Sequence, residues 1–210
     1  MGQLFNVSDT IPPGDRDEAV AFFERILGNS NPLNVELGSG NGHFLAEWAM
    51  RHPGQNFVGT EILSGRARKF QSKVDKRGIT NLVVFRGDVR RFVWEFLHEE
   101  MVEEFIALFP DPWPKKRHHK HRLLSAPFIR MLRGRLTHGG VVTVATDSVE
   151  YREFILSEFE EAGGFRSLFH DGFGEYPSDY PETLFFKRFK AQGWNISYMR
   201  FEKADENTIH

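Results

Sequence analysis

The sequence predicts an α/β fold of the Rossmann-like kind, with a single, mostly parallel sheet. From Leu33 onwards, short apolar runs alternate with amphipathic stretches of helical length, a pattern that is typical of right-handed βαβ units. In addition, five successive predicted strands have an acidic residue at or near their carboxyl ends. Open α/β sheets bind ligands beyond the carboxyl ends of their strands, so we expect these acids to converge on one crevice.

Seven strands are expected, each a short run rich in apolar, β-branched or aromatic residues. They cover residues 33–37, 56–61, 82–86, 105–109, 141–146, 165–170 and 196–202. The first five alternate with helices and should therefore be parallel. The last two are separated by residues 171–193, which show no clear amphipathic helix. We therefore expect these two strands to form an antiparallel edge of the seven-stranded sheet.

Five helices are expected from apolar residues that share one face or from adjacent stop signals. They cover residues 17–27, 44–50, 64–76, 125–136 and 151–162. Gly28 and Gly78 directly follow two of them and can adopt the left-handed conformation that ends a helix. We expect residues 1–33 to form a lead-in with one helix, and residues 34–210 to form the ligand-binding domain.

The composition excludes several classes of protein. The chain has 210 residues, of which 40% are hydrophobic and 27% charged, and this suits one folded domain. It contains no Cys, which rules out disulfides, thiol nucleophiles and thiolate metal sites. The N-terminal segment lacks a signal-peptide pattern, and no apolar run is long enough to span a bilayer. We therefore expect a cytoplasmic monomer or homodimer that does not bind membranes.

Five acids and a glycine-rich loop define the expected ligand site. The acids, in chain order, are Glu36, Glu61, Asp88, Asp111 and Asp147. A single acid after a strand is more often a helix N-cap than a ligand contact, but five in register favour a site. Gly38, Gly40 and Gly42 form a G-x-G-x-G turn directly after the first predicted strand. Such a turn lets the backbone approach a ligand closely.

The residues around this turn distinguish between ligands. A dinucleotide-binding loop needs a third glycine where this chain has His43, and the chain contains no P-loop. A carboxylate at Glu36 is of little use to a pyrophosphate, but it suits S-adenosylmethionine (AdoMet), which carries a sulfonium and an ammonium group. Glu61 would suit the ribose hydroxyls of AdoMet, and Asp88 its adenine amine. We therefore expect AdoMet to bind at these residues and at Gly38, Gly40 and Gly42.

The segment FPDPWPKKRHHKHR, residues 109–122, is a second candidate motif. Its three prolines restrict the backbone on either side of Asp111 and Trp113. A rigid acid beside an aromatic ring at the carboxyl edge of a sheet suits a flat base. The alternative is that Trp113 packs against the sheet edge while Asp111 accepts hydrogen bonds from backbone amides.

Five basic residues follow Trp113 within eight positions: Lys115, Lys116, Arg117, Lys120 and Arg122. Taking these five charges from the net charge of −2 leaves −7 for the rest of the chain. A charge run is usually a solvated face, but beside an acidic crevice it can hold phosphates, and here we favour contact with RNA. The spacing of His118, His119 and His121 is poor for metal ligation, so we expect no metal.

Residues 34–202 resemble the bacterial tRNA (guanine-N7-)-methyltransferases. NVELGSGNGHFL resembles their AdoMet loop and VGTEI the acidic end of their second strand, while FPDPWPKKRHHKHR is the most specific match. ATD at residues 145–147 and the segment 183–193 complete the resemblance. It implies an AdoMet-dependent methyltransferase domain over residues 34–210, which acts on tRNA rather than DNA. The implied reaction is methylation of N7 of guanine 46 in the tRNA variable loop.

The resemblance also implies roles for single residues. AdoMet contacts would come from Glu36, Glu61, Asp88 and Asp111, and substrate contacts from Lys115, Asp147 and Thr183. RNA contacts would come from Lys116, Arg117, His118, His119, Lys120, His121 and Arg122. The family's Thr-x-x-Glu motif aligns with residues 183–186, so Phe186 stands where an acid is expected. Glu175 and Glu182 are candidate substitutes for that acid.

Guanine N7 has a lone pair and no proton to lose, so methylating it requires no strong base. We expect Asp111 to be the catalytic residue, because its carboxylate can orient the base and stabilise the cationic product. Two alternatives stay open. An amino methyltransferase acting on adenine or cytosine carries an Asp-Pro-Pro-Tyr type of loop that resembles residues 111–113, and Phe186 alone favours an inactive tRNA-binding homologue. His43 and Glu36 disfavour a nicotinamide dehydrogenase.

Overall fold

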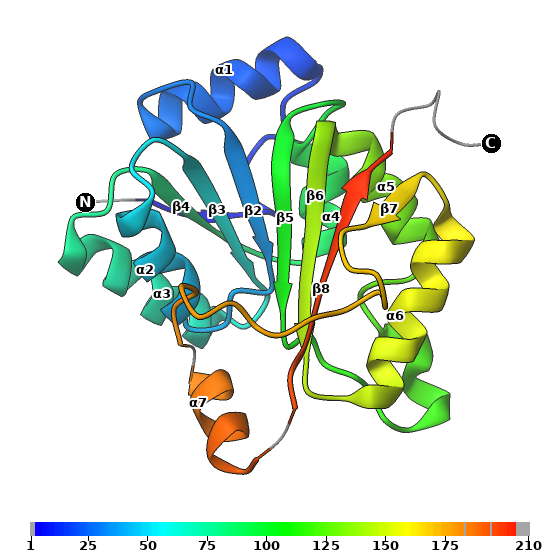
Figure 1. Ribbon diagram of the computed structural model, residues 1–210. Coiled ribbons are helices and arrows are strands. Elements are labelled where there is room, and N and C mark those ends of the chain that lie inside the picture. Colours follow the sequence, from blue (N-terminus) through cyan, green and yellow to red (C-terminus); the bar gives the residue numbers. More distant parts are fainter. Residues whose placement is uncertain (1–2, 183, 194, 205–210) are drawn as a thin grey trace.

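The computed structural model describes residues 3–182, 184–193 and 195–204, and it shows an α/β fold with helices on both faces of one sheet (Figure 1). The strands are β1 (Leu4–Asn6), β2 (Leu33–Leu37), β3 (Asn56–Glu61), β4 (Leu82–Arg86), β5 (Val102–Leu108), β6 (Leu136–Thr146), β7 (Phe165–Ser167) and β8 (Ser197–Lys203). The helices are α1 (Arg16–Leu27), α2 (His43–Arg51), α3 (Ser64–Arg77), α4 (Val89–Phe96), α5 (Ala126–Arg135), α6 (Val149–Ala162) and α7 (Leu184–Ala191), together with the 3₁₀ helix η1 (Lys116–His121).

The sheet is parallel except at one edge. Its strand order is β1-β4-β3-β2-β5-β6-β8-β7. β1 to β6 run parallel, whereas β8 is antiparallel to both of its neighbours, β6 and β7. The direction of the strand order reverses between β2 and β5, and at such a switch point open α/β sheets bind their ligands. The predicted Rossmann-like fold, parallel sheet and antiparallel edge are therefore confirmed.

The structure contains elements that the sequence pattern did not predict. β1 adds an eighth strand in what was expected to be a lead-in, and it pairs with β4 along three residues. The Phe5 ring of β1 stacks on Phe85 of β4, with ring centroids 5.0 Å apart. α4, η1 and α7 are also additional. Each of these elements is short, so neither apolar periodicity nor alternation extends far enough to predict it.

Two apolar clusters, one on each face of the sheet, hold the layers together. On one face, α4 and α6 contribute the fully buried Phe92 and Ile155. On the other face, α2 and α3 contribute the fully buried Leu45 and Phe70. Each such side chain contributes about 1.5–3 kcal/mol through burial. The two clusters thereby fix the loops that connect these helices to the carboxyl ends of the strands.

The helices are amphipathic. α1, for example, buries Ala19, Phe23 and Leu27. It begins where the Asp15 side chain accepts a hydrogen bond from the Glu18 amide, and it ends at Gly28, whose φ is 78°. Within the described parts of the chain, no helix combines the length and apolar character needed to cross a bilayer.

Candidate functional site

The glycine loop is a tight turn between β2 and α2. Gly38, Gly40 and Gly42 have φ values of 86°, 58° and 63°, which lie in the left-handed region that favours glycine. The Ser39 amide donates a hydrogen bond to the Thr60 carbonyl oxygen at 2.7 Å, and the Gly38 amide donates to Thr60 Oγ1 at 3.1 Å. β3 therefore holds the loop in its turn.

Phe70 of α3 packs directly beneath the glycine loop. A Cβ atom added at Gly42 would lie 1.8 Å from the Phe70 ring, and one added at Gly59 of β3 would lie 2.3 Å from it. By contrast, a Cβ at Gly40 would meet open space. The glycine at position 42 is thus required both by its backbone conformation and by the ring below it.

We expect Gly42→Ala to destabilise the protein by about 2–4 kcal/mol, because left-handed strain and overpacking against Phe70 add together. Gly40→Ala is the matched control, since its φ is also positive but its Cβ has room, and it should cost only about 1–2 kcal/mol. Urea denaturation of both variants measures the difference. Equal losses would mean that Phe70 moves aside without cost.

Glu36 is a buried acid at the carboxyl end of β2. It is 3% exposed, and its Oε2 atom has no hydrogen-bond partner among the described residues. Burial raises the pKa of Glu36 to about 7; the Ser39 hydroxyl opposes this shift, the charge of Glu61 adds to it and that of Lys73 opposes it. A buried carboxylate with an unused oxygen is an uncompensated group that a cationic ligand would stabilise.

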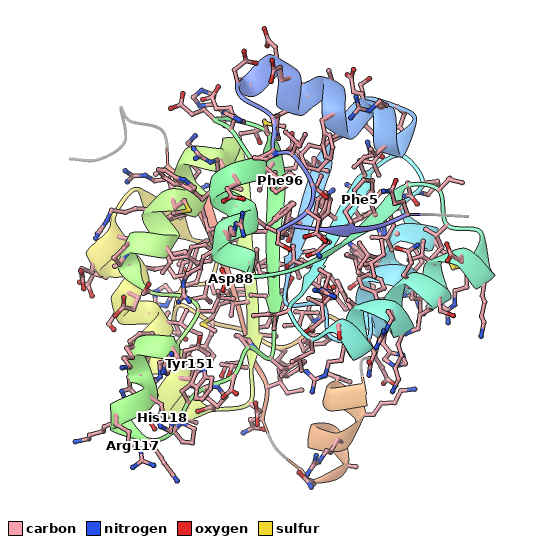
Figure 2. All side chains as sticks on the ribbon, turned by 180° about the vertical axis from the view of Figure 1, so that it is seen from behind. Phe5, Asp88, Phe96, Arg117, His118 and Tyr151 are labelled. Atoms are coloured by element: carbon pink, nitrogen blue, oxygen red, sulfur yellow. The ribbon has the colours of Figure 1, made fainter. Side chains whose placement is uncertain are left out.

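Glu61 and Asp88 follow the next two strands along the same edge. Glu61, which ends β3, is 5% exposed and accepts a hydrogen bond from the Leu63 amide at 2.7 Å through Oε1. Asp88 is exposed and caps α4, because its Oδ1 accepts from the Arg91 amide at 3.0 Å; Figure 2 shows it at the start of that helix. Each of these hydrogen bonds uses one of the two carboxylate oxygens. Asp88 can therefore cap α4 and still be a candidate ligand contact.

Asp111 lies in the loop after β5 and is exposed. Its Oδ1 accepts a hydrogen bond from the Trp113 amide at 3.0 Å, which closes a turn of the Asx type. Phe109 and Trp113 have φ values of 54° and 43°, which are uncommon for residues other than glycine. The loop therefore takes a specific conformation on both sides of Asp111. The strand order places Asp111 next to Glu36 along the carboxyl edge, and Asp147, half-buried, follows β6.

The basic run forms η1 and the turns around it. Lys115, Lys116, Arg117 and Lys120 are exposed, and Figure 2 shows the Arg117 and His118 side chains at one end of the molecule. His118 and His119 are half-buried, while His121 is exposed. The Trp113 ring lies 5.6 Å from the His118 ring and 5.2 Å from that of His121, so these histidines pack around the tryptophan.

Arg122 differs from the rest of the run because it is buried, with 3% exposure. Its Nε donates to the Pro112 carbonyl oxygen at 2.9 Å, and its Nη2 donates to Glu150 at 2.7 Å. Its guanidinium also lies 4.6 Å from the centre of the Phe154 ring. Arg122 thus anchors the Asp111 loop to α6 and is not placed to face RNA.

The aligned substrate motif is only partly described. Thr183 lies outside the described residues. Glu182 is exposed, with its carboxylate 3.7 Å from Lys187 Nζ, and Glu175 is exposed as well. Phe186 packs against Tyr176, with ring centroids 4.5 Å apart. The position aligned with the family's acid therefore belongs to an aromatic cluster.

Tyr176 and Lys73 are site residues that the sequence analysis missed. The Tyr176 ring lies 6.3 Å from that of Phe109, and its hydroxyl is buried without a described partner. Burial raises the pKa of Tyr176, and the charge of Glu36 raises it further. Lys73 Nζ donates to the Asn41 carbonyl oxygen of the glycine loop at 2.7 Å. Both residues reach the site from elements distant in sequence, and no local motif marks them.

The described residues contain no group of three or more His, Cys, Asp or Glu side chains placed to hold a metal ion. The donors at the carboxyl edge instead fit AdoMet. Glu36 offers a buried anionic oxygen for its positive charge, and the glycine loop leaves open space at Gly38 and Gly40. Glu61 ends the neighbouring strand β3 at the same edge of the sheet.

Solved structures share this fold. The 16S rRNA methyltransferase KamB superimposes with a TM-score of 0.61 at 16% identity, covering 88% of this chain and 94% of that one. An rRNA methylase from Streptococcus thermophilus gives a TM-score of 0.55 at 14% identity, covering 89% and 95%. This chain therefore has the Rossmann-like fold of these methyltransferases, with the glycine loop and the buried acid at its switch point.

Sequence relatives define the family more closely. Residues 30–196 match the family described as "Putative methyltransferase". A tRNA (guanine-N(7)-)-methyltransferase of Pseudomonas fluorescens strain Pf0-1 is 34% identical over 187 residues, which are 89% of this chain and 78% of the relative. One from Chromohalobacter salexigens is 36% identical over 185 residues, covering 85% and 75%. The chain belongs to the tRNA (guanine-N7-)-methyltransferase family, which is AdoMet-dependent.

Proposed function

We propose that this protein transfers the methyl group of AdoMet to N7 of guanine in tRNA, at guanine 46 of the variable loop. The observation that carries the proposal is the pairing, on neighbouring strands β2 and β5, of the buried Glu36 with the rigid Asp111 loop. Glu36 provides an anionic pocket for a cationic methyl donor. The Asp111 loop presents an exposed carboxylate where a base could enter. Family membership supports the same reaction and substrate.

In this proposal each acid of the edge has its own task. Glu36 binds the positively charged methionine end of AdoMet, and Gly38, Gly40 and Gly42 let the cofactor approach the backbone. Glu61 binds the ribose through the carboxylate oxygen that does not accept from Leu63, and Asp88 contacts the adenine amine. Lys115 binds a phosphate or the guanine O6, and Asp147 keeps the substrate contact that the resemblance implies. Thr183 keeps the substrate role that the resemblance implies.

AdoMet supplies a methyl group bound to a sulfonium sulfur. The N7 lone pair forms the new carbon–nitrogen bond while the carbon–sulfur bond breaks, and the positive charge passes to the guanine ring. No proton has to leave, so Asp111 is not needed as a base. Its carboxylate holds the guanine in line and stabilises the charge that develops on the ring. The turn to Trp113 keeps this carboxylate in place beforehand.

The decisive experiment incubates the protein with labelled AdoMet and unmodified tRNA, followed by nucleoside analysis. The proposal requires 7-methylguanosine, and its loss when guanine 46 is replaced in the transcript. Label on an exocyclic amine of adenine or cytosine would establish the amino-methyltransferase alternative. Tight tRNA binding without measurable AdoMet affinity would identify an inactive tRNA-binding homologue.

Replacing Lys115, Lys116 and Arg117 together by glutamine should weaken tRNA binding and reduce its salt dependence. Three lost phosphate contacts would lower the slope of log Kd against log salt by about 2–3. A matched control replaces Arg25, Arg130 and Arg166, which are exposed on α1, α5 and β7. Fluorescence anisotropy at several salt concentrations measures both slopes. If the two variants behave alike, the basic run is only a solvated face.

A further inference from the structure

α3 carries a concentration of positive charge that, apart from Lys73, the proposed site does not use. Its 14 residues contain six cations and one acid, Asp75; the cations are Arg66, Arg68, Lys69, Lys73, Lys76 and Arg77. The helix therefore has a net charge of +5, equal to that of the basic run. Removing both segments from the chain's −2 leaves −12 for the rest. These two segments therefore carry a net positive charge, while the rest of the chain is net acidic.

The charges of α3 are not neutralised by the fold. All its cations except Lys73 are exposed, and among the described residues none of the six lies within ion-pairing distance of a carboxylate. Lys73 and Arg77 are spaced four apart, so they repel each other along one face. Burial lowers the pKa of Lys73 to about 8, and the charge of Arg77 lowers it further, although Glu36 opposes this. An anion bound at this face would relieve the repulsion.

Five of the six cations line a groove along the helix. Its volume is about 650 Å³, and its walls are Gly65, Arg68, Lys69, Ser72, Lys73, Lys76 and Arg77. Gly65 and Ser72 are small, which leaves room between the long basic side chains. An α-helix of 14 residues is about 21 Å long, and duplex nucleic acid carries about one phosphate per 1.7 Å of its axis. Several phosphates could therefore lie along this face at once.

The groove adjoins the AdoMet site. Lys73 forms one of its walls and also binds the Asn41 carbonyl oxygen of the glycine loop. α3 follows β3, while the basic run follows β5, and these two strands flank β2 in the sheet. Figures 1 and 2 accordingly place α3 and the Arg117–His118 segment on opposite sides of the carboxyl end of the sheet. The acidic crevice lies between two basic flanks.

We propose that the α3 groove is a second binding surface for the tRNA backbone, which holds the substrate from the side opposite to the basic run. This inference rests on the proposed function, because it takes tRNA as the polyanion. With phosphates bound by α3 on one side and by the basic run on the other, the target guanine is held over the crevice. The acids of the crevice, which repel RNA, are then offset on both sides. α3 would act on substrate binding and not on the methyl-transfer step.

The test uses a variant with Arg68→Gln, Lys69→Gln and Lys76→Gln, and keeps Lys73 because it binds the glycine loop. We expect tRNA affinity to fall about tenfold and the salt slope to decrease by about 2–3, as for three lost phosphate contacts. The KM for tRNA should rise while kcat stays near that of the wild type. AdoMet affinity by calorimetry and the melting temperature should be unchanged, which shows that the variant is folded.

The Arg25, Arg130 and Arg166 triple variant is again the control, since it removes the same charge from positions that do not line the groove. The inference is overturned if the α3 variant and this control have equal tRNA affinities and salt slopes, whatever the wild-type activity. It is also overturned if kcat falls while tRNA affinity is kept. The proposed function fails separately, if wild-type protein forms no 7-methylguanosine. A wild type that binds tRNA through α3 without methylating it would retain the inference and remove the function.

Discussion

Asp111→Asn should lower kcat for tRNA methylation by about 10²–10³-fold, the usual loss when one preorganised group that stabilises transition-state charge is removed. Asparagine is the informative replacement. Its amide oxygen can still accept the hydrogen bond from the Trp113 amide, which is 3.0 Å long in the wild type. The loop should therefore keep its conformation and lose only the negative charge. Single-turnover measurements with saturating AdoMet and tRNA isolate the chemical step.

Asp88→Asn provides the matched comparison. Asp88 is also an exposed aspartate after a strand, and it also accepts a hydrogen bond from a backbone amide, that of Arg91. Its proposed contact is with the adenine of AdoMet, so asparagine here should raise the KM for AdoMet and change kcat much less. Single-turnover rates for Asp111→Asn equal to those of the wild type would remove Asp111 from the catalytic role.

The fold was predictable where local sequence and tertiary contacts agree. The predicted boundaries of β2, β3 and β4 coincide with the observed ones, because each is a buried apolar strand followed by a loop and an amphipathic helix. β1 was not predictable, because its three residues become a strand only by pairing with β4 about 80 residues later. β6 begins at Leu136 instead of 141; the sequence THGG reads as a break, yet these residues continue the strand.

The parts of the candidate site that depend on local sequence were also predictable. The glycine turn and the acids at strand ends are local features, and the structure places them at one edge. The sequence could not show which hydrogen bonds and packing contacts each side chain makes. Arg122 looked like one member of a basic run, but long-range contacts with Pro112 and Glu150 bury it. Tyr176 comes to the site through aromatic packing against Phe109 and Phe186, contacts that no spacing rule encodes.

Glu36→Gln should weaken AdoMet binding about 10- to 100-fold, the range expected when a hydrogen bond to a charged group is lost at a buried position. The change keeps the shape of the side chain and removes its charge, so the fold should be retained. Calorimetric titration with AdoMet measures the affinity. A control variant, Glu104→Gln, removes a half-buried carboxyl on β5 whose pKa is also raised by burial. Glu104 lies outside the proposed crevice, so this variant should bind AdoMet normally. Equal affinity in the wild type and in Glu36→Gln would contradict the anionic pocket.

The pH dependence of binding provides a second test of the same residue. The pKa of Glu36 is about 7 in the ligand-free protein, so most of the population is neutral at pH 6 and must ionise to bind a cation. AdoMet affinity should therefore increase about fivefold to tenfold between pH 6 and pH 7.5, and Glu36→Gln should abolish this increase.

The stability of the ligand-free protein should change in the opposite direction over the same pH range. Because the folded-state pKa lies above the ordinary value of 4.5, the protonated group favours folding at low pH, and this contribution is lost as pH rises through about 7. The Tm of the free wild type should thus fall relative to Glu36→Gln over this range, and AdoMet should restore it.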